Sequence, residues 1–411
     1  MGNDRKRVFG ILFLGWLIWG SLFSCVQLIK EQIPGTIRLY EEEAVSVLSG
    51  TQKKLSPQQL HLDFAGNIEF RRKTGGTYQA VCQLFGIIPL TTMEVEVVSK
   101  QELFPGGIPV GVYVQTDGIF VIGTGDIRTE QGSVKSPAEH IVKTGDYITS
   151  FQGEPITRKG QLIERLKKFQ GEELVLGIRR NQEEMQVSIH PVYQEDQCYI
   201  GIWVRDDTQG IGTLTFVTEE GNFAALGHGI SDTDSELLME VSKGKLYNCE
   251  IIGITKGKAG APGKLSGKIV YHQNYLLGQI SGNLSGGIYG KANQRLVENL
   301  SEETLPIALK QEVREGEATI LSSVDGSLQE YKVEIRKIYR GEKDVNKGME
   351  IVVTDERLLE LTGGIVQGMS GSPILQNGKL VGAVTHVLVN DPTSGYGIFI
   401  ENMLDAAREK M

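Results

Sequence analysis

The glycine-rich stretch near the C-terminal end has the residue types of a nucleophile turn. Residues 362–386 read TGGIVQGMSGSPILQNGKLVGAVTH, and Ser370 and Ser372 stand where Gly and Pro interrupt three strand-like apolar runs. A serine on a sharp turn can present its hydroxyl outward while neighbouring backbone N–H groups point into the same space, which suits attack on a carbonyl carbon. The ordinary alternative is a strand connection in which glycine supplies backbone freedom and serine caps the turn. An acyl-transfer site therefore depends on the chain also supplying a base.

Histidine is the usual base for a serine nucleophile. The chain has six, which are His61, His140, His190, His228, His272 and His386. His228 lies in AALGHGISD, where an apolar strand runs into a glycine turn, so its imidazole is expected at a strand end. Histidines in such positions are more often structural than catalytic. His386 follows Ser370 by only sixteen residues and is interpreted as core or pocket wall rather than as the base.

The base in turn needs a carboxylate on its far ring nitrogen, to hold the tautomer and to stabilise the imidazolium. Asp232 follows His228 by four residues in HGISDTD, where a turn-stabilising role is the ordinary interpretation. Asp355 ends an apolar strand fifteen residues before Ser370 and can also act as the N-cap of a helix beginning ERLLEL. The residue pattern leaves both aspartates as candidates.

The N-terminal region predicts a membrane span. Basic residues 5–7 precede an uncharged run over residues 8–29, whose 22 residues reach about 33 Å as a helix. Because the basic cluster is expected to stay cytoplasmic, residues 1–30 are interpreted as a signal anchor, with the remaining chain outside the cytoplasm. A cleaved signal peptide is the alternative. The stretch LFSC suggests lipidation of Cys25, and its plain alternative is an apolar cysteine within the span.

Beyond the anchor, the chain divides into three segments of different pattern. Residues 31–104 show strand-like alternation and are interpreted as a β-rich connector. Residues 105–193 mix strands with two short helices, whereas residues 194–411 contain many short strands between glycine-rich turns and end in a helical tail. The sequence therefore predicts a mainly β protein whose last segment forms one or two antiparallel barrels.

Within residues 105–193, the stretches TDGIFVIG and SPAEHIVKTGDYITSFQGEPI resemble a PDZ domain of the bacterial protease type. The resemblance implies a module that adds an extended peptide to a sheet edge, with loop N–H groups holding the terminal carboxylate of the peptide. The expected carboxylate loop is GGIPVGVYV, with Ile108, Pro109, Val110 and Gly111 as its binding residues. The alternative is a spacer, or a groove filled by the chain's own residues.

The composition argues against two other classes of protein. The formal net charge of −9 and the dispersed basic residues argue against nucleic acid as a partner. Cys82, Cys198 and Cys249 lie far apart without a C-x-x-C pair, so neither a zinc site nor a dense disulfide framework is indicated. Buried thiols that pack as small apolar side chains are expected instead.

Three stretches follow the N-terminal span and the PDZ-like unit in this order: AALGHGISD, IVVTDERLLELTGGIVQGMSGSPI and GKLVGAVTHVLVNDPTSGYGIFIENML. Through these stretches, the chain resembles the stage IV sporulation protein B peptidases. The likeness covers nearly the whole chain. It implies a chymotrypsin-like serine peptidase with a double β-barrel, in which Ser370 is the nucleophile, His228 the base and Asp355 the orienting acid. It also implies an oxyanion hole built from the backbone N–H groups of Gly368 and Ser370, with no metal or organic cofactor.

Two neighbours of Ser370 bear on this assignment. Met369 stands where trypsin-type zymogens have Asp, so activation by a freed N-terminal amine is not expected. Ser372 is directly followed by Pro373 and is expected to begin a strand rather than act as the nucleophile.

The resemblance further implies a role in spore formation. Such enzymes are exported from the forespore and stay membrane-anchored or are released into the space between the two spore membranes. There they cut the exposed part of a membrane protein complex that restrains an intramembrane metalloprotease, which then matures a late sigma factor. They also cut themselves near the N-terminus, here expected within residues 31–75.

Two other functions remain alternatives. One is a catalytically inactive, membrane-tethered PDZ module that only binds peptides. The other is an envelope quality-control protease, in which the PDZ domain normally follows the protease domain instead of preceding it.

Overall fold

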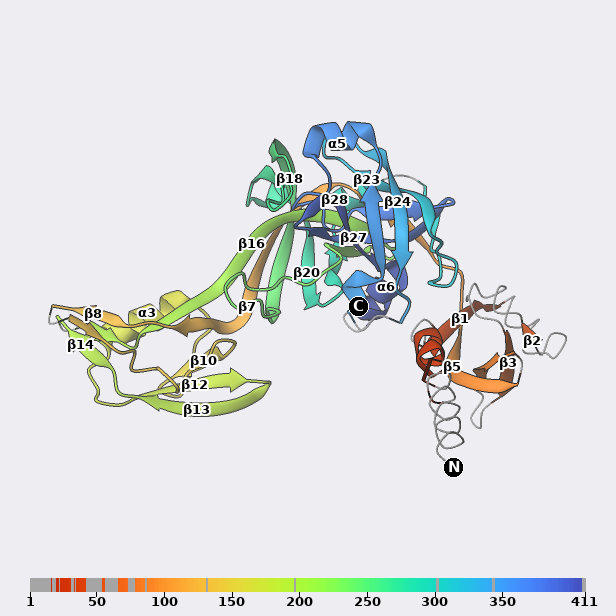
Figure 1. Cartoon of the computed structure of the whole chain (residues 1–411). Coiled ribbons are helices and arrows are strands. Elements are labelled where there is room, and N and C mark those ends of the chain that lie inside the picture. The colour runs from red at the N-terminus through yellow and green to blue at the C-terminus, as the bar shows by residue number, and fades with distance from the viewer. Residues whose placement is uncertain are drawn as a thin grey trace, which may run out of the picture.

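The computed structural model contains three β-rich parts (Figure 1). It describes residues 16, 20–21, 23–30, 33, 35–41, 54–55, 66–72, 78–85, 87–130, 132–195, 197–300, 303–341 and 344–408. A pair of β-barrels lies between a small N-terminal sheet and a PDZ-like unit. Among the residues described, no helix is both long and apolar enough to cross a bilayer, and the expected span over residues 8–29 lies partly outside them.

The N-terminal unit is a five-stranded sheet in the order β1-β5-β4-β3-β2. Its strands are β1 (Thr36–Tyr40), β2 (Lys54–Leu55), β3 (Gly66–Arg72), β4 (Tyr78–Leu84) and β5 (Ile88–Val98). β1 runs parallel to β5, whereas the other neighbours are antiparallel. Ile37 and Leu39 of β1 and Met93 of β5 meet in one core, as the two-residue period of a half-buried strand requires.

Six antiparallel strands close the first barrel, in the order β7-β18-β20-β21-β17-β16, with β16 returning to β7. They are β7 (Pro109–Thr124), β16 (Ile202–Val217), β17 (Asn222–Ala225), β18 (Val241–Thr255), β20 (Leu276–Leu284) and β21 (Gly287–Ala292). Val110, Val112 and Val114 alternate along β7 and are buried with Leu214 in the barrel core. The accessory elements are β6 (Glu102–Pro105), β19 (Lys264–Ile269), η2 (Gln273–Tyr275), α4 (Gln294–Glu298) and β22 (Leu305–Pro306).

The second barrel is also closed by six strands, in the order β23-β24-β25-β28-β27-β26. They are β23 (Gly316–Ser322), β24 (Gln329–Ile338), β25 (Met349–Val353), β26 (Pro373–Gln376), β27 (Lys379–Leu388) and β28 (Asp391–Phe399). η3 (Val345–Lys347) and α5 (Glu356–Thr362) flank β25, and α6 (Ile400–Arg408) follows β28. The predictions of a mainly β protein and of two barrels are confirmed.

The PDZ-like unit is inserted into the first barrel. Its own elements are β8 (Ile127–Thr129), β9 (Gly132–Val134), β10 (Tyr147–Phe151), β11 (Glu154–Pro155), α3 (Lys159–Lys168), β12 (Leu174–Arg180), β13 (Glu183–Ile189), β14 (Val192–Gln194) and β15 (Gln197–Tyr199). β7 and β16 serve both parts: residues 202–205 of β16 pair with 120–124 in the PDZ-like unit, and residues 207–213 pair with 109–115 in the barrel. The unit therefore interrupts the barrel instead of preceding it, and its strands extend beyond the expected limits of 105–193.

The expected carboxylate loop is part of the barrel. Pro109, Val110 and Gly111 pair with residues 211–213 of β16, and the carbonyl of Ile108 accepts a hydrogen bond from the Leu214 N–H. Gly and Pro are common in loops, but here Gly111 is needed because a Cβ would lie 2.6 Å from the Ile269 side chain. These four residues are therefore structural, and the structure does not place them in the PDZ-like unit.

Candidate active site

His228 and Ser370 line one cavity of about 470 Å³ at the junction of the two barrels. The first barrel contributes Leu226 and His228 to its wall, and the second contributes Val366, Ser370 and Thr385. Residues on distant parts of the chain thus meet because the two barrels pack side by side. The position of a serine and a histidine on opposite barrels is the arrangement that a chymotrypsin-like site requires.

The turn that carries Ser370 is held against β16 by hydrogen bonds. The Thr213 N–H donates to the Ser370 carbonyl at 2.9 Å, and the Thr213 hydroxyl donates to the Gly368 carbonyl at 2.8 Å. Gly371 has φ of 98°, and a Cβ there would lie 2.1 Å from the Thr213 carbonyl oxygen. The Gly-x-Ser-Gly pattern is therefore required by backbone conformation and by close packing on the neighbouring strand.

Two backbone N–H groups of this turn are left without a protein acceptor. Three other residues of the turn donate their backbone N–H to backbone carbonyls, namely Met369, Gly371 and Ser372. The N–H groups of Gly368 and Ser370 make no such bond within the described part of the chain, and both residues line the cavity. The hydroxyl of Ser370 donates to the Thr385 carbonyl at 2.8 Å. These two amides are the groups that an oxyanion could use.

Ser372 does not reach the cavity. It is fully buried, its hydroxyl has no hydrogen-bond partner, and the strand β26 begins at the next residue, Pro373. Of the two serines in the turn, only Ser370 is in a position to meet a substrate.

His228 lies just after β17, where Leu226 and Gly227 both have positive φ and turn the chain toward the second barrel. Its Nδ1 lies 2.9 Å from the Gly229 carbonyl oxygen. A carbonyl can only accept, so Nδ1 carries the proton and Nε2 keeps the lone pair. Burial lowers the pKa of His228 below 6.5, and the bond to Gly229 opposes this only in part. The imidazole is therefore neutral near pH 7 and has the free nitrogen that a base needs.

A second imidazole stands beside the first. The rings of His228 and His386 are tilted by 33° with centroids 5.0 Å apart, and His386 lies on β27 in the cavity wall. Desolvation by surrounding side chains, followed by the charge of a protonated His228, lowers the pKa of His386 to about 4, although solvent still reaches its side chain. Since two charged rings at this distance would repel, the pair favours a neutral site.

Asp355 is not at the cavity. It is the N-cap of α5, where its carboxylate accepts hydrogen bonds from the Arg357 N–H at 3.0 Å and from the Lys332 N–H at 3.1 Å. The guanidinium of Arg357 holds the same carboxylate at 2.9 Å and, as the main cause, lowers the pKa of Asp355 to about 2. The expected role as orienting acid is therefore not what the structure contains. The structure contains the capping alternative instead, because the helix that begins ERLLEL needs a hydrogen-bond acceptor for the N–H groups of its first turn.

Asp232 fixes the loop that follows His228 but does not contact the imidazole. Its side chain is buried and pairs with Arg205 at 2.6 Å, and it also accepts hydrogen bonds from the backbone of Asp234 and Ser235. Arg205 lies on β16 where that strand belongs to the PDZ-like unit. The aspartate thus ties the His228 loop to the inserted unit.

Asn283 is a positioning residue that the sequence did not indicate. Its side-chain oxygen accepts from the Ile230 N–H at 2.7 Å, and its amide donates to the carbonyls of Ile230 and Met239. It thereby fixes the residue next to Gly229, whose carbonyl orients His228. A lone Asn in the glycine-rich stretch GNLSGG carries no spacing signal that could have identified this role.

No set of His, Cys, Asp and Glu side chains within the described ranges is arranged to hold a metal ion. The four cysteines are unpaired there, with Cys25 exposed and Cys82, Cys198 and Cys249 buried. The three buried thiols therefore act as small packing groups.

Comparison with protein families gives one match. Residues 196–404 match the family described as SpoIVB peptidase S55. Among curated proteins, none matches the chain.

Several solved structures resemble parts of the chain at low identity. The PDZ domain of an SdrC-like protein from Listeria monocytogenes is 19% identical, with a TM-score of 0.18, covering 22% of this chain and 90% of its own. The HtrA-type protease AlgW with decapeptide is 13% identical, with a TM-score of 0.29, covering 53% of this chain and 55% of its own. The Rv3671c protease from M. tuberculosis in its active form is 13% identical, with a TM-score of 0.27, covering 49% of this chain and 74% of its own.

Replacing Asp355 with alanine is expected to lower the free energy of unfolding by about 1 kcal/mol at pH 7, because the N-cap is lost. The pKa of Asp355 is lowered in the folded protein, so its carboxylate stabilises the fold fully when the pH is above the ordinary aspartate pKa near 4. This stabilisation is lost as the pH falls toward the folded-state pKa of about 2. Urea unfolding of the wild type and Asp355→Ala between pH 2 and 7 measures the difference. Asp355→Asn keeps the capping oxygen and should lose less unfolding free energy than Asp355→Ala. A difference that does not shrink in acid would argue against this role.

Proposed function

The chain belongs to the SpoIVB peptidase S55 family and is a serine endopeptidase, and we propose that Ser370 is its nucleophile and His228 its base. The observation that carries this assignment is the shared cavity, in which a serine with two unpaired amides faces a neutral histidine from the other barrel. Ser370 attacks the peptide carbonyl, while Nε2 of His228 takes the hydroxyl proton and passes it to the leaving amine. Water then hydrolyses the acyl-enzyme by the same route.

The N–H groups of Gly368 and Ser370 stabilise the oxyanion in this proposal, and one such donor is typically worth about 3 kcal/mol of transition-state stabilisation. The Gly229 carbonyl fixes the tautomer of His228, in place of the carboxylate found in a triad. The site therefore works as a serine–histidine dyad, and Asp355 contributes through the stability of the second barrel.

The substrate binds in extended form beside β27. Thr385, His386 and Val387 of this strand line the cavity next to Ser370. A substrate N–H that pairs with the Thr385 carbonyl replaces the hydroxyl of Ser370 there and frees it to turn toward His228. The apolar walls formed by Ile365 and Val366 favour an aliphatic side chain before the scissile bond.

The PDZ-like unit binds a peptide at the edge of β16. One edge of residues 202–206 pairs with β7, and the other pairs with no strand in the described part of the chain. Leu162 and Leu166 of α3 share a core cluster with Ile202 and Val204, so the helix packs beside this part of β16. A peptide added to this edge would lie next to Arg205, which holds the His228 loop through Asp232.

In the cell, we propose that the enzyme acts in spore formation. It cleaves itself within residues 31–75 and cuts the exposed part of a membrane protein complex between the two spore membranes. This leads to activation of an intramembrane metalloprotease and maturation of a late sigma factor. The N-terminal helix anchors it in the forespore membrane, and self-cleavage removes the covalent link. The family membership and the uncharged run over residues 8–29 support these roles.

A second function is a peptide-binding module that does not catalyse. Two observations favour it: among the described residues no carboxylate contacts His228, and the hydroxyl of Ser370 donates to a carbonyl instead of to the imidazole. Nucleophile labelling distinguishes the two.

Ser370→Ala and His228→Ala should each lower kcat by about 10⁶-fold and abolish labelling by a fluorophosphonate, because the nucleophile or its base is lost. Ser372→Ala is the matched control: it removes a buried hydroxyl two residues away and should leave labelling unchanged. Asp355→Asn should retain kcat within about threefold, whereas an orienting acid would cost about 10⁴-fold. Absence of labelling in the folded wild type would support the binding module.

The pH dependence of kcat/KM should report the lowered pKa of His228. A base must be neutral, so activity is lost as the pH falls through the pKa of the folded enzyme, which lies below 6.5. We expect a flat profile between pH 6.5 and 8 and an acid limb with its midpoint below 6.5. A midpoint at pH 7 or above would mean that a carboxylate or another anion acts on the imidazole.

Arg205→Met should reduce kcat at least tenfold with little change in KM for a short peptide, because Asp232 loses its cation and the His228 loop is no longer held. Arg165→Met is the matched control, since Arg165 pairs with Glu154 inside the PDZ-like unit and away from that loop. Thermal unfolding of both variants separates loop disorder from global unfolding. Equal kinetics in the two variants would show that the ion pair plays no part.

A further inference from the structure

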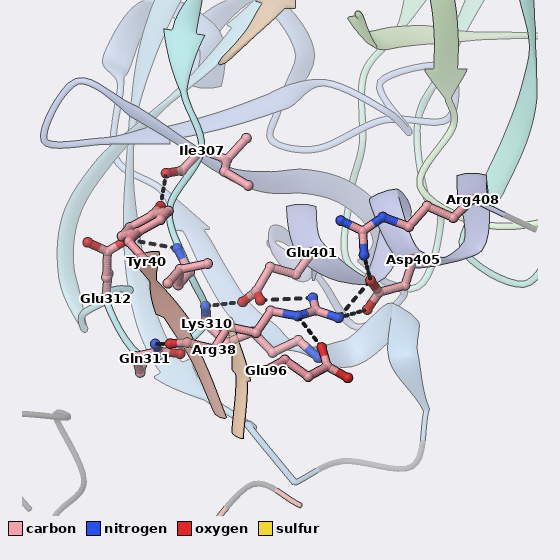
Figure 2. Close-up of polar contacts among 11 residues, drawn as sticks. Arg38, Tyr40, Glu96, Ile307, Lys310, Gln311, Glu312, Glu401, Asp405 and Arg408 are labelled. Carbon is pink, nitrogen blue, oxygen red and sulfur yellow. Dashed lines mark hydrogen bonds and ion pairs between the residues drawn. The ribbon is translucent and has the colours of Figure 1, made fainter. Parts of the chain in front are cut away.

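Strand β1 has two faces that contact different parts of the protein. Ile37 and Leu39 are almost fully buried in the core of the N-terminal sheet. Arg38 and Tyr40 alternate with them and contact the catalytic part instead (Figure 2). Successive side chains of a strand point to opposite faces, so β1 lies between the two parts and belongs to both.

Arg38 occupies a notch formed by Glu401 and Asp405 of α6, at the other end of the chain, and by Gln311. Its guanidinium donates to Glu401 at 2.9 Å, to both oxygens of Asp405 at 2.8 and 2.9 Å, and to Glu96 of β5 at 2.9 Å (Figure 2). Glu401 is 3% exposed and also accepts a hydrogen bond from the Lys310 N–H. Burial opposes the charge of Arg38, but the bond to Asp405 and the charges of Glu401 and Glu96 outweigh it and raise its pKa.

Two further contacts attach the same strand to the segment that leads into the second barrel. The Tyr40 hydroxyl donates to the Ile307 carbonyl at 3.2 Å, and the Gln311 side-chain amide donates to the Arg38 carbonyl. On its edge, β1 pairs with β5 over five residues, from Thr36 with Glu94 to Tyr40 with Val98. None of these contacts uses the chain between β1 and β2.

We propose that the notch formed by Glu401, Asp405 and Gln311 is a docking site for β1, and that this strand holds the N-terminal end of the protein on the catalytic part without a covalent link. A break of the backbone within residues 42–53 would separate β1, and everything before it, from the rest of the chain. The two fragments would remain bound through Arg38, Tyr40 and the pairing with β5. Charge-assisted hydrogen bonds to carboxylates are the strong kind of polar contact, and here the bonds to the buried Glu401 and the partly exposed Asp405 add to the burial of Ile37 and Leu39.

The inference does not rest on the proposed catalysis, so its test uses an inactive chain. The full chain carrying Ser370→Ala, an N-terminal affinity tag and a recognition sequence for a site-specific protease between Gly50 and Thr51 is purified in detergent micelles. It is cut to completion, bound through the tag and washed, and the retained C-terminal fragment is measured. We expect nearly all of that fragment to be retained. Its prompt release would overturn the proposal.

The Arg38→Met variant tests the notch. After cutting, its C-terminal fragment should dissociate at least tenfold faster than that of the parent chain, whereas the uncut variant stays intact. Asp405→Asn removes part of the same contact from α6 and should also accelerate release of the C-terminal fragment. Because this substitution leaves β1 unchanged, faster release in this variant cannot come from a folding defect of the strand. Arg336→Met is the matched control, because Arg336 forms an exposed ion pair with Glu350 on the second barrel. Equal dissociation rates in Arg38→Met and Arg336→Met would overturn the role of the notch.

Discussion

The backbone hydrogen bonds of β16 are the constraint on which the rest of this structure depends. This one strand pairs with β7 first in the PDZ-like unit and then in the barrel, with a register shift between Arg205 and Asp207 where the two parts meet (Figure 1). Along its length it holds the His228 loop through Arg205 and the Ser370 turn through Thr213. The proposed base, the proposed nucleophile and the inserted unit are therefore all linked to the same strand. A peptide that binds at one end of β16 acts on the same strand that holds the catalytic turn.

The proposed serine–histidine dyad has a different electrostatic balance from a triad. A carboxylate on Nδ1 would hold the tautomer and also stabilise the imidazolium, whereas the Gly229 carbonyl holds the tautomer but brings no full charge. Burial disfavours a charged His228, and the bond to Gly229 offsets this only in part. In the proposed mechanism the stabilisation of the transition state therefore falls more heavily on the amides of Gly368 and Ser370, which lie in the turn that packs on β16.

Local patterns in the sequence predicted what depends on local conformation. GMSGSP identified the turn because Gly368 and Gly371 need positive φ, and AALGHG placed His228 at the end of a strand. Alternation over long strands could not indicate that β7 and β16 continue from the barrel into the inserted unit, so the sequence predicts that unit as a separate domain. Asp355 satisfied both an N-cap pattern and a triad pattern, and only the packing of the second barrel decides between them.

The same limit explains why the notch on α6 is invisible in the sequence: Arg38 and Glu401 are 363 residues apart, and nothing local links them. In the fold, α6 continues directly from β28, and Ile400 and Met403 pack in one core with Ile398 and Ala383 of the strands next to the cavity. The helix that contacts β1 is therefore built on the same pair of strands that places Thr385 and His386 in the cavity wall. The N-terminal contact and the proposed substrate edge therefore share one closely packed core, which α6 forms with β27 and β28.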